Sequence, residues 1–140
     1  MGDLTENLSR KEFACECGCG FDTIDYEVVV AIQHCADRYK TATGKKVSVK
    51  INCGCRCEKH NKDLRDLYIK TDGKQGANTA ENSLHQKGRA SDIVLFVDNV
   101  KVSPKEIADF FKKNYPKFGI GDYSTFTHID SRTGGGGARW

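Results

Sequence analysis

The sequence lacks several features that would assign it to a broad class of protein. No segment approaches the roughly 18 consecutive apolar residues that a membrane-spanning helix needs, so no membrane span is expected. The N-terminal stretch MGDLTENLSRKEF has neither an apolar core nor a cleavage pattern, which predicts no signal peptide and synthesis in the cytoplasm. No internal repeat is present, and the net charge of +3 is too mild to identify a polyanionic partner.

What is present is the composition of an ordinary globular chain. Hydrophobic residues make up 38% and charged residues 29% of the 140 residues, which argues against long disordered segments. A chain of this length can bury roughly two thirds of its unfolded surface. We therefore expect one monomeric domain over residues 1–140, with a cysteine-rich N-terminal segment at about 8–22.

The order of helical and strand patterns predicts an α+β domain, in which a small, mainly antiparallel sheet is flanked by helices. Asp25 and Ser103 are the expected N-caps of two helices, and Gly44 is the expected end of the first. Helices are expected at 26–41, 58–69 and 104–114. Strands are expected at 46–51 and at 90–97, the latter with a tight turn and a hairpin return. A last strand is expected from FGIG followed by STFTHIDSR (118–132), and a loop is expected at 71–82.

Seven cysteines are many for a chain of this size, and their odd number excludes a complete intramolecular disulfide set. Without a secretory signal, metal binding or reduced thiols are expected instead. Cys35 falls on the apolar face of the first helix and is expected in the core. A second, structural metal could be held by the two C-x-C-x-C runs, Cys15, Cys17, Cys19, Cys53, Cys55 and Cys57, although zinc knuckles more often use C-x2-C.

The stretch SLHQKGRASD contains a pair of candidate metal ligands. His85 precedes a predicted strand and Asp92 lies on it, while Gly88 permits a tight turn and Ala90 leaves room beside the site. His128, on the last predicted strand, would complete a set of two imidazoles and a carboxylate. Such a set suits zinc better than magnesium or calcium, which prefer oxygen ligands. Each residue alone also fits an ordinary structural role.

Three sequence blocks, together with the C-terminal residues, strengthen the metal interpretation through a resemblance. The pattern S-x-H-x-x-G-x-A-x-D, from Ser83 to Asp92, resembles the signature of the zinc D-alanyl-D-alanine carboxypeptidase family. That family includes phage endolysin peptidases and shares its metal fold with the hedgehog signalling domain. A glycine-rich approach to a His-x-Asp strand, Gly119–Arg132, resembles the family too. So do a Gly-x-Arg-x-x-x-His-Asn block at Gly54, Arg56, His60 and Asn61 and the C-terminal Ala-Arg-Trp at 138–140.

The resemblance implies a zinc peptidase with His85, Asp92 and His128 as ligands of one catalytic zinc ion. Its implied substrate is the peptide stem or cross-bridge of bacterial peptidoglycan, cleaved by a carboxypeptidase or an endopeptidase. With no signal peptide in view, a phage-type lytic enzyme that reaches the cell wall after release is an attractive role. Many relatives place a glutamate three residues before the last ligand, where this chain has Thr125.

Two carboxylates remain as candidates for proton transfer. Asp130 lies two residues after His128, so on a strand the two side chains face the same way. Asp122 lies in the approach to that strand, where a mobile carboxylate could reach the metal. Asp130 is preferred because its direction follows from strand geometry. Its alternative role is to orient a ligand or an arginine, and that of Asp122 is a solvated turn residue.

Arginine and serine side chains are the candidates for holding substrate. Arg56 can bind a terminal carboxylate through two parallel hydrogen bonds, as the resemblance also implies. Arg132 shares the face of His128 by strand alternation and could assist, while Ser83 could bind the substrate or a ligand. Surface ion pairs and a turn-capping hydroxyl are the structural alternatives. His60 is expected to be structural.

Two other functions remain open on the sequence alone. Because Thr125 replaces the expected glutamate, the chain could be a non-catalytic binding module stabilised by zinc on the same fold. A small zinc–cysteine nucleic-acid binder would need a basic stripe interleaved with exposed aromatic residues, and the lysines are scattered instead. No nucleic-acid partner is therefore expected.

Overall fold

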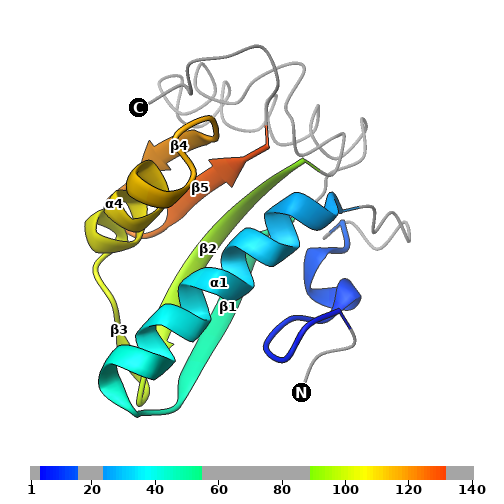
Figure 1. Ribbon diagram of the computed structural model, residues 1–140. Coiled ribbons are helices and arrows are strands. Elements are labelled where there is room, and N and C mark those ends of the chain that lie inside the picture. Colours follow the sequence, from blue (N-terminus) through cyan, green and yellow to red (C-terminus); the bar gives the residue numbers. More distant parts are fainter. Residues whose placement is uncertain (1–3, 16–23, 55–88, 132–140) are drawn as a thin grey trace, which may run out of the picture.

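An antiparallel sheet organises the part of the chain that the computed structural model describes, residues 4–15, 24–54 and 89–131 (Figure 1). Strands β1, β2, β5 and β4 lie in that order, and the short β3 pairs with β2. Helices α1 and α4 pack on one face of the sheet. The strands are β1 (Val47–Cys53), β2 (Ala90–Val97), β3 (Val100–Lys101), β4 (Gly119–Asp122) and β5 (Thr127–Asp130); the helices are η1 (Arg10–Phe13), α1 (Tyr26–Thr43) and α4 (Pro104–Asn114). This confirms the predicted α+β class.

Helix α1 begins and ends where its capping residues predict. The Asp25 carboxylate accepts a hydrogen bond from the backbone N–H of Glu27 at 3.0 Å, which satisfies one of the unpaired N–H groups at the helix start. Gly44 follows the last turn with a φ of 66°, the left-handed conformation that ends many helices. The helix extends two residues beyond the predicted Thr41, to Thr43.

The second half of the described chain departs from the prediction in two places. The turn at Asp98 and Asn99 forms as predicted, with φ values of 51° and 65° that suit a tight hairpin. Ser103 precedes α4, but its side chain makes no capping hydrogen bond, and Pro104 fixes the first turn instead. The predicted last strand is instead two antiparallel strands, because the chain turns at the Tyr123 N–H···O=C Phe126 bond (3.2 Å) and separates β4 from β5. The predicted helix at 58–69 and loop at 71–82 lie outside the described residues.

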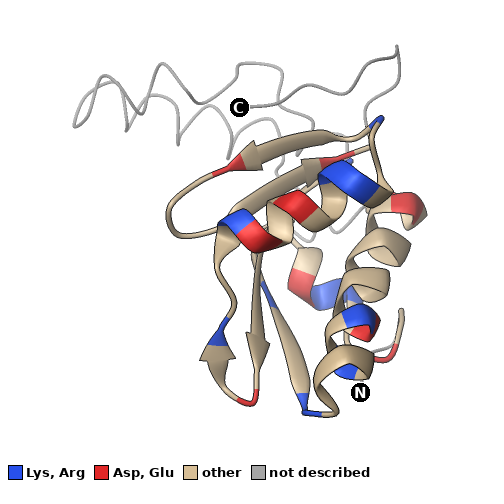
Figure 2. Ribbon diagram, turned by 60° about the vertical axis from the view of Figure 1, so that its left-hand side comes forward, with Lys and Arg blue, Asp and Glu red and all other residues tan. Residues whose placement is uncertain are grey.

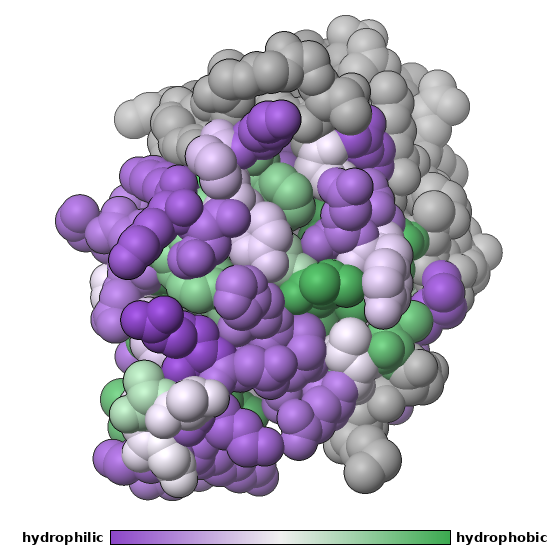
Figure 3. Space-filling model, in the orientation of Figure 1, coloured by the Kyte–Doolittle hydropathy of each residue, from purple (hydrophilic) through white to green (hydrophobic). Residues whose placement is uncertain are grey.

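The core lies between the sheet and the two helices. Alternate residues of β2, β4 and β5 point into it, together with apolar residues of α1 and α4. Its fully buried large side chains are Leu8, Phe13, Val28, Val29, Ile32, Ile93, Leu95, Ile107, Phe111, Ile120 and Ile129. The outer side of the helices is largely hydrophilic (Figure 3), and acidic and basic residues are interspersed along them (Figure 2). Neither described helix is long and apolar enough to span a bilayer.

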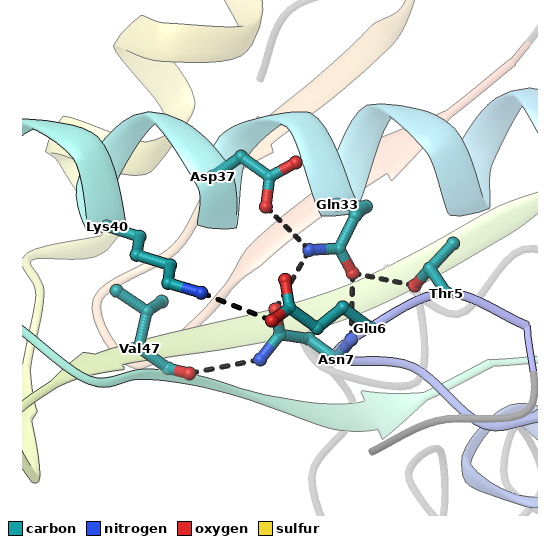
Figure 4. A network of polar contacts seen from close by, with 7 residues as sticks. All are labelled: Thr5, Glu6, Asn7, Gln33, Asp37, Lys40 and Val47. Atoms are coloured by element: carbon teal, nitrogen blue, oxygen red, sulfur yellow. Dashed lines mark hydrogen bonds and ion pairs between the residues drawn. The ribbon is translucent and has the colours of Figure 1, made fainter.

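The described N-terminal segment, residues 4–15, is tied to both α1 and β1 by a polar network (Figure 4). Gln33 on α1 accepts hydrogen bonds from the Thr5 hydroxyl at 2.6 Å and the Asn7 N–H at 2.9 Å. The Gln33 amide in turn donates to the Asn7 side chain at 2.8 Å, and Asn7 donates to the Val47 carbonyl of β1 at 3.1 Å. These bonds hold the segment over one end of the core, where Leu8 and Phe13 are buried.

Burial of Cys35 makes the free energy of unfolding depend on pH in the alkaline range. Burial in the core, with a smaller contribution from Glu106, raises the pKa of Cys35 from 9.0 to about 12. The folded state therefore favours the protonated thiol, and this contribution is complete below pH 9.0 and lost as the pH rises toward 12. We expect the stability difference between wild type and Cys35→Ala to shrink by about 2 kcal/mol from pH 8 to pH 10.5. Urea unfolding of both proteins under reducing conditions measures it, and a difference independent of pH would contradict the prediction.

Candidate metal centre

Two of the predicted metal ligands lie side by side on neighbouring strands. Strands β2 and β5 are antiparallel, and their register sets Asp92 directly opposite His128. Residues that face each other in this way project to the same side of the sheet. The Asp92 Oδ1 and His128 Nδ1 atoms are 2.8 Å apart, within hydrogen-bonding distance. The sheet therefore brings together a carboxylate and an imidazole that are 36 positions apart in the sequence.

Asp130 contacts the other nitrogen of the same imidazole. Its Oδ2 atom lies 2.9 Å from His128 Nε2, and its Oδ1 atom accepts a hydrogen bond from the Gly119 N–H at 3.2 Å. The Asp130 side chain is fully buried, whereas the Asp92 and His128 side chains are 17% and 12% exposed. The imidazole thus lies between two carboxylates, one at the surface of the site and one beneath it.

The three side chains lie on the sheet face opposite to α1 and α4. Ile129, between His128 and Asp130, points into the core, so its two neighbours point to the other face. The register sets Ala90 opposite Asp130 and Gly121 opposite His128. The cross-strand partners of Asp130 and His128 on this face are therefore both small residues.

The two carboxylates determine the protonation of His128 in the metal-free protein. Burial acts to lower the pKa of His128, but hydrogen bonds from the ring to Asp130 and Asp92, and the negative charges of these carboxylates, act against it. The carboxylates outweigh burial, and the pKa of His128 lies above its ordinary value of 6.5. Without a metal, the doubly protonated ring, with one N–H directed at each carboxylate, is therefore more favoured than in a free imidazole.

Asp122 is not brought together with these groups. It is the last residue of β4 and is exposed, and its register partner is Thr127 rather than His128. Thr127 belongs to the helix side of the sheet, where its hydroxyl donates to the Pro104 carbonyl at 2.9 Å. By strand alternation the Asp122 side chain points to that same side.

A polar cluster that the sequence did not predict fixes the ends of β2 and β5. The Ser131 hydroxyl donates to Asp25 Oδ2 at 2.8 Å, and Arg89 Nε lies 3.7 Å from the same oxygen. Arg89 and Ser131 also pair through their backbones, and the Arg89 guanidinium donates to the Ser131 carbonyl. Asp25 thereby caps α1 and also holds the residues that flank Ala90 and Asp130. The only sequence signal for it was the capping role of Asp25.

The other predicted site residues lie outside the described residues: His85, Ser83, Arg56, Arg132, His60, Cys17, Cys19, Cys55 and Cys57. In the segments that the structure describes, no group of three or more His, Cys, Asp or Glu side chains could hold a metal ion. Two described cysteines belong to the C-x-C-x-C runs. Cys15 is buried two residues after Phe13, and Cys53 ends β1 beside Gly54, whose Cα packs against the Phe13 backbone.

The donor atoms of the described residues are of types that zinc binds. Asp92 and His128 offer one carboxylate oxygen and one imidazole nitrogen at adjacent positions on rigid strands. Zinc accepts mixed nitrogen and oxygen donors, and catalytic sites commonly use three protein ligands. A carboxylate beside the second ring nitrogen of a ligand histidine recurs in such sites, and the Asp130 carboxylate lies 2.9 Å from Nε2 of His128.

The chain resembles a family of known proteins over most of its length. A family model described as peptidase M15 matches residues 6–130. No curated protein matches the chain. One similar solved structure is a mutant of the vancomycin-resistance D,D-pentapeptidase VanY from a VanB-type resistance cassette, in complex with Zn(II). It shares 20% sequence identity with a TM-score of 0.45, over 69% of this chain and 59% of the VanY chain.

Proposed function

This chain belongs to the peptidase M15 family, and on that premise we propose that it is a zinc-dependent peptidase acting on bacterial peptidoglycan. Its reaction would be hydrolysis of an amide bond in the peptide stem or the cross-bridge. The observation that carries the proposal is the contact between Asp92 and His128 across β2 and β5. That contact joins the two sequence blocks that resemble zinc D-alanyl-D-alanine carboxypeptidases.

His85, Asp92 and His128 would hold the metal. When bound there, zinc would supply Lewis acidity for amide hydrolysis, polarising the scissile carbonyl and making water reactive near neutral pH. Asp92 and His128 meet the metal from two paired strands, which fixes the separation of their donor atoms. His128 must release the proton on its metal-facing nitrogen before it can act as a ligand.

The remaining roles belong to residues that bind substrate or transfer protons. Arg56 would hold a substrate carboxylate through paired hydrogen bonds, with Arg132 and Ser83 in supporting positions. Proton transfer from water to the leaving amine requires an acidic side chain within reach of both. Asp130 and Asp122 are the residues that the sequence offers for this step, and their surroundings differ as described above.

Digestion of purified peptidoglycan, followed by mass spectrometry of the fragments, tests the proposed reaction. We expect products with the zinc-loaded protein that disappear when a chelator is added and return with zinc. Release of D-alanine would identify a carboxypeptidase, whereas split stems or lost cross-links would identify an endopeptidase. A zinc-loaded, folded protein that yields no chelator-sensitive product would contradict the peptidase proposal.

A non-catalytic binding module is the second candidate, and one observation favours it. Thr125 stands where many relatives carry the proton-transferring glutamate, and its carbonyl accepts a hydrogen bond from Lys101 at 2.8 Å. A module of this kind would bind peptidoglycan fragments in a zinc-dependent manner and leave them intact. Calorimetry with muropeptides, run beside the digestion experiment, separates the two functions.

We further propose a phage-type lytic role, in which the enzyme reaches the cell wall after release from the cytoplasm. The support for this role is the sequence alone. Expression inside a bacterium tests it: lysis is expected only when a membrane-permeabilising protein is supplied as well. Lysis that needs no such protein would contradict release-dependent access to the wall.

A second, structural metal on the paired cysteine runs is also proposed. The contact between Gly54 and Phe13 supports it, because Gly54 adjoins Cys53 and Phe13 lies close to Cys15, and these are the first cysteines of the two runs. Elemental analysis of the reduced protein would then give two zinc ions per chain, and one ion per chain would contradict the proposal.

A further inference from the structure

The Asp130 carboxylate is held on both sides by its neighbours in the sheet. On one side, its Oδ1 atom accepts the backbone N–H of Gly119 on β4 at 3.2 Å. On the other, its Oδ2 atom lies 2.9 Å from His128 Nε2. Asp130 also pairs through its backbone register with Gly119 and Ala90, so strands on both sides fix its Cα. The carboxylate therefore has little freedom to turn toward another group.

The two nitrogens of the His128 ring have different surroundings. Nδ1 faces Asp92, a predicted metal ligand whose side chain is 17% exposed. Nε2 faces Asp130, whose side chain is fully buried. A metal replaces the proton on the nitrogen that it binds, and the other nitrogen keeps its N–H as a donor. A metal shared with Asp92 and approached from the exposed side would therefore bind at Nδ1.

We infer that Asp130 is a positioning residue of the metal centre, whose buried carboxylate holds the Nε2–H of His128 and so presents Nδ1, beside Asp92, to the metal. This inference rests on the proposed function, because it takes Asp92 and His128 as ligands. It names the role of Asp130 within that site: the carboxylate acts through His128 and not on the substrate.

The geometry opposes the alternative that Asp130 is the proton-transferring base. Such a base must lie within hydrogen-bonding distance of the attacking water, directly or through one further water. The Asp130 side chain has no exposed surface, and its two oxygens are directed at the His128 ring and the Gly119 N–H. The imidazole lies between Asp130 and Asp92, so the ring separates the buried carboxylate from the metal side of the site.

An amide at position 130 would disturb the ring in a defined way. Among the described residues, the Asp130 carboxylate meets the N–H groups of Gly119 and His128, whereas an amide would offer them one oxygen and one NH2 donor. If the amide oxygen keeps the Gly119 bond, its NH2 group meets Nε2, which must then accept, and the ring proton moves to Nδ1. That tautomer blocks the nitrogen that the metal needs. Asp130→Asn should therefore weaken metal binding although it barely changes the shape of the side chain.

Zinc affinity of purified variants, measured by competition with a chromophoric chelator, tests the inference. For Asp130→Asn and Asp130→Ala we expect the zinc dissociation constant to rise about 10–100-fold over wild type. The control is Asp109→Asn, the same chemical change at an exposed residue of α4 that pairs with Lys105, and it should leave the zinc affinity unchanged. With saturating zinc, kcat of the position 130 variants should stay within about tenfold of wild type, because removal of a general base would cost about 10²–10⁴-fold.

Nitrogen-15 NMR of the histidine rings adds a readout that a purely structural defect would not move. The zinc-loaded wild type should show His128 with Nδ1 bound to metal and Nε2 protonated, and metal-free Asp130→Asn should gain the Nδ1-protonated form. If Asp130→Ala does not fold, the isosteric Asp130→Asn carries the test. Variants with wild-type zinc affinity and a large loss of kcat would overturn the positioning role while leaving the peptidase proposal intact. A wild type that binds no zinc would instead overturn the proposed function, and with it this inference.

Discussion

Replacing His128 by alanine is expected to abolish chelator-sensitive cleavage and to lower the stability of the metal-free protein by about 3–5 kcal/mol. The loss of activity follows from removal of a proposed metal ligand. The loss of stability follows because Asp92 and Asp130 would remain close together without the group that joins them through its two nitrogens. Removing one partner of a buried ion pair lowers stability by more than the intact pair contributes, because the other charge is left without its partner.

Urea unfolding in the presence of a chelator measures the stability term, and zinc titration followed by peptidoglycan digestion measures the functional term. His34→Ala is the matched control: His34 is exposed on α1 and its Nδ1 atom lies 2.8 Å from the Tyr115 hydroxyl. Its loss should cost about 1 kcal/mol and leave zinc affinity unchanged. A His128→Ala protein that keeps wild-type zinc affinity and cleavage would rule out this histidine as a ligand.

The second large effect is expected for Gly54→Ala, which should destabilise the protein by about 2–3 kcal/mol. A Cβ at this position would lie 2.5 Å from the Phe13 carbonyl oxygen and closer still to the Phe13 Cα. These are backbone atoms, so they cannot turn aside as a flexible side chain would. Either β1 or η1 has to shift, and the packing of the buried Phe13 ring shifts with it.

Gly44→Ala provides the comparison for this prediction. A Cβ at Gly44 meets nothing within 4 Å, so the added methyl group has space, but the φ of 66° disfavours an L-residue. Its cost should be about 1 kcal/mol and purely conformational. Thermal or urea unfolding of both variants gives the comparison. A Gly54→Ala protein as stable as Gly44→Ala would mean that the close approach of the two backbones is not required.

Sequence patterns that span only a few residues predicted several helices, strands and turns correctly. The helix after Asp25, the strand at 90–97 and the turn at Asp98–Asn99 depend on capping, alternation and turn residues within a few positions. The capping bond of Ser103 was not formed, although its sequence pattern is a common one. The same pattern also fits a helix whose first turn is fixed by proline, and local sequence does not distinguish the two.

The site depends on relations that a single sequence does not contain. The contact between Asp92 and His128 requires a particular register between β2 and β5, and a slip of one residue would send the two side chains to opposite faces. The sequence correctly placed Asp130 on the face of His128, but its burial depends on how the surrounding chain packs. The bond from Gly119 needs the division of the predicted last strand into β4 and β5.

The strand order has a consequence for how the protein would lose its metal. The strands that carry Asp92, His128 and Asp130 have paired neighbours on both sides, β1 and β5 around β2, and β2 and β4 around β5. Amide hydrogens in such interior strands exchange with solvent mainly through the largest openings of a domain, whereas frayed edges exchange through small ones. Release of zinc by distortion of the ligand strands would then require the same opening that unfolds the sheet. Heat inactivation and global hydrogen exchange should consequently respond in parallel to any substitution that stabilises the core.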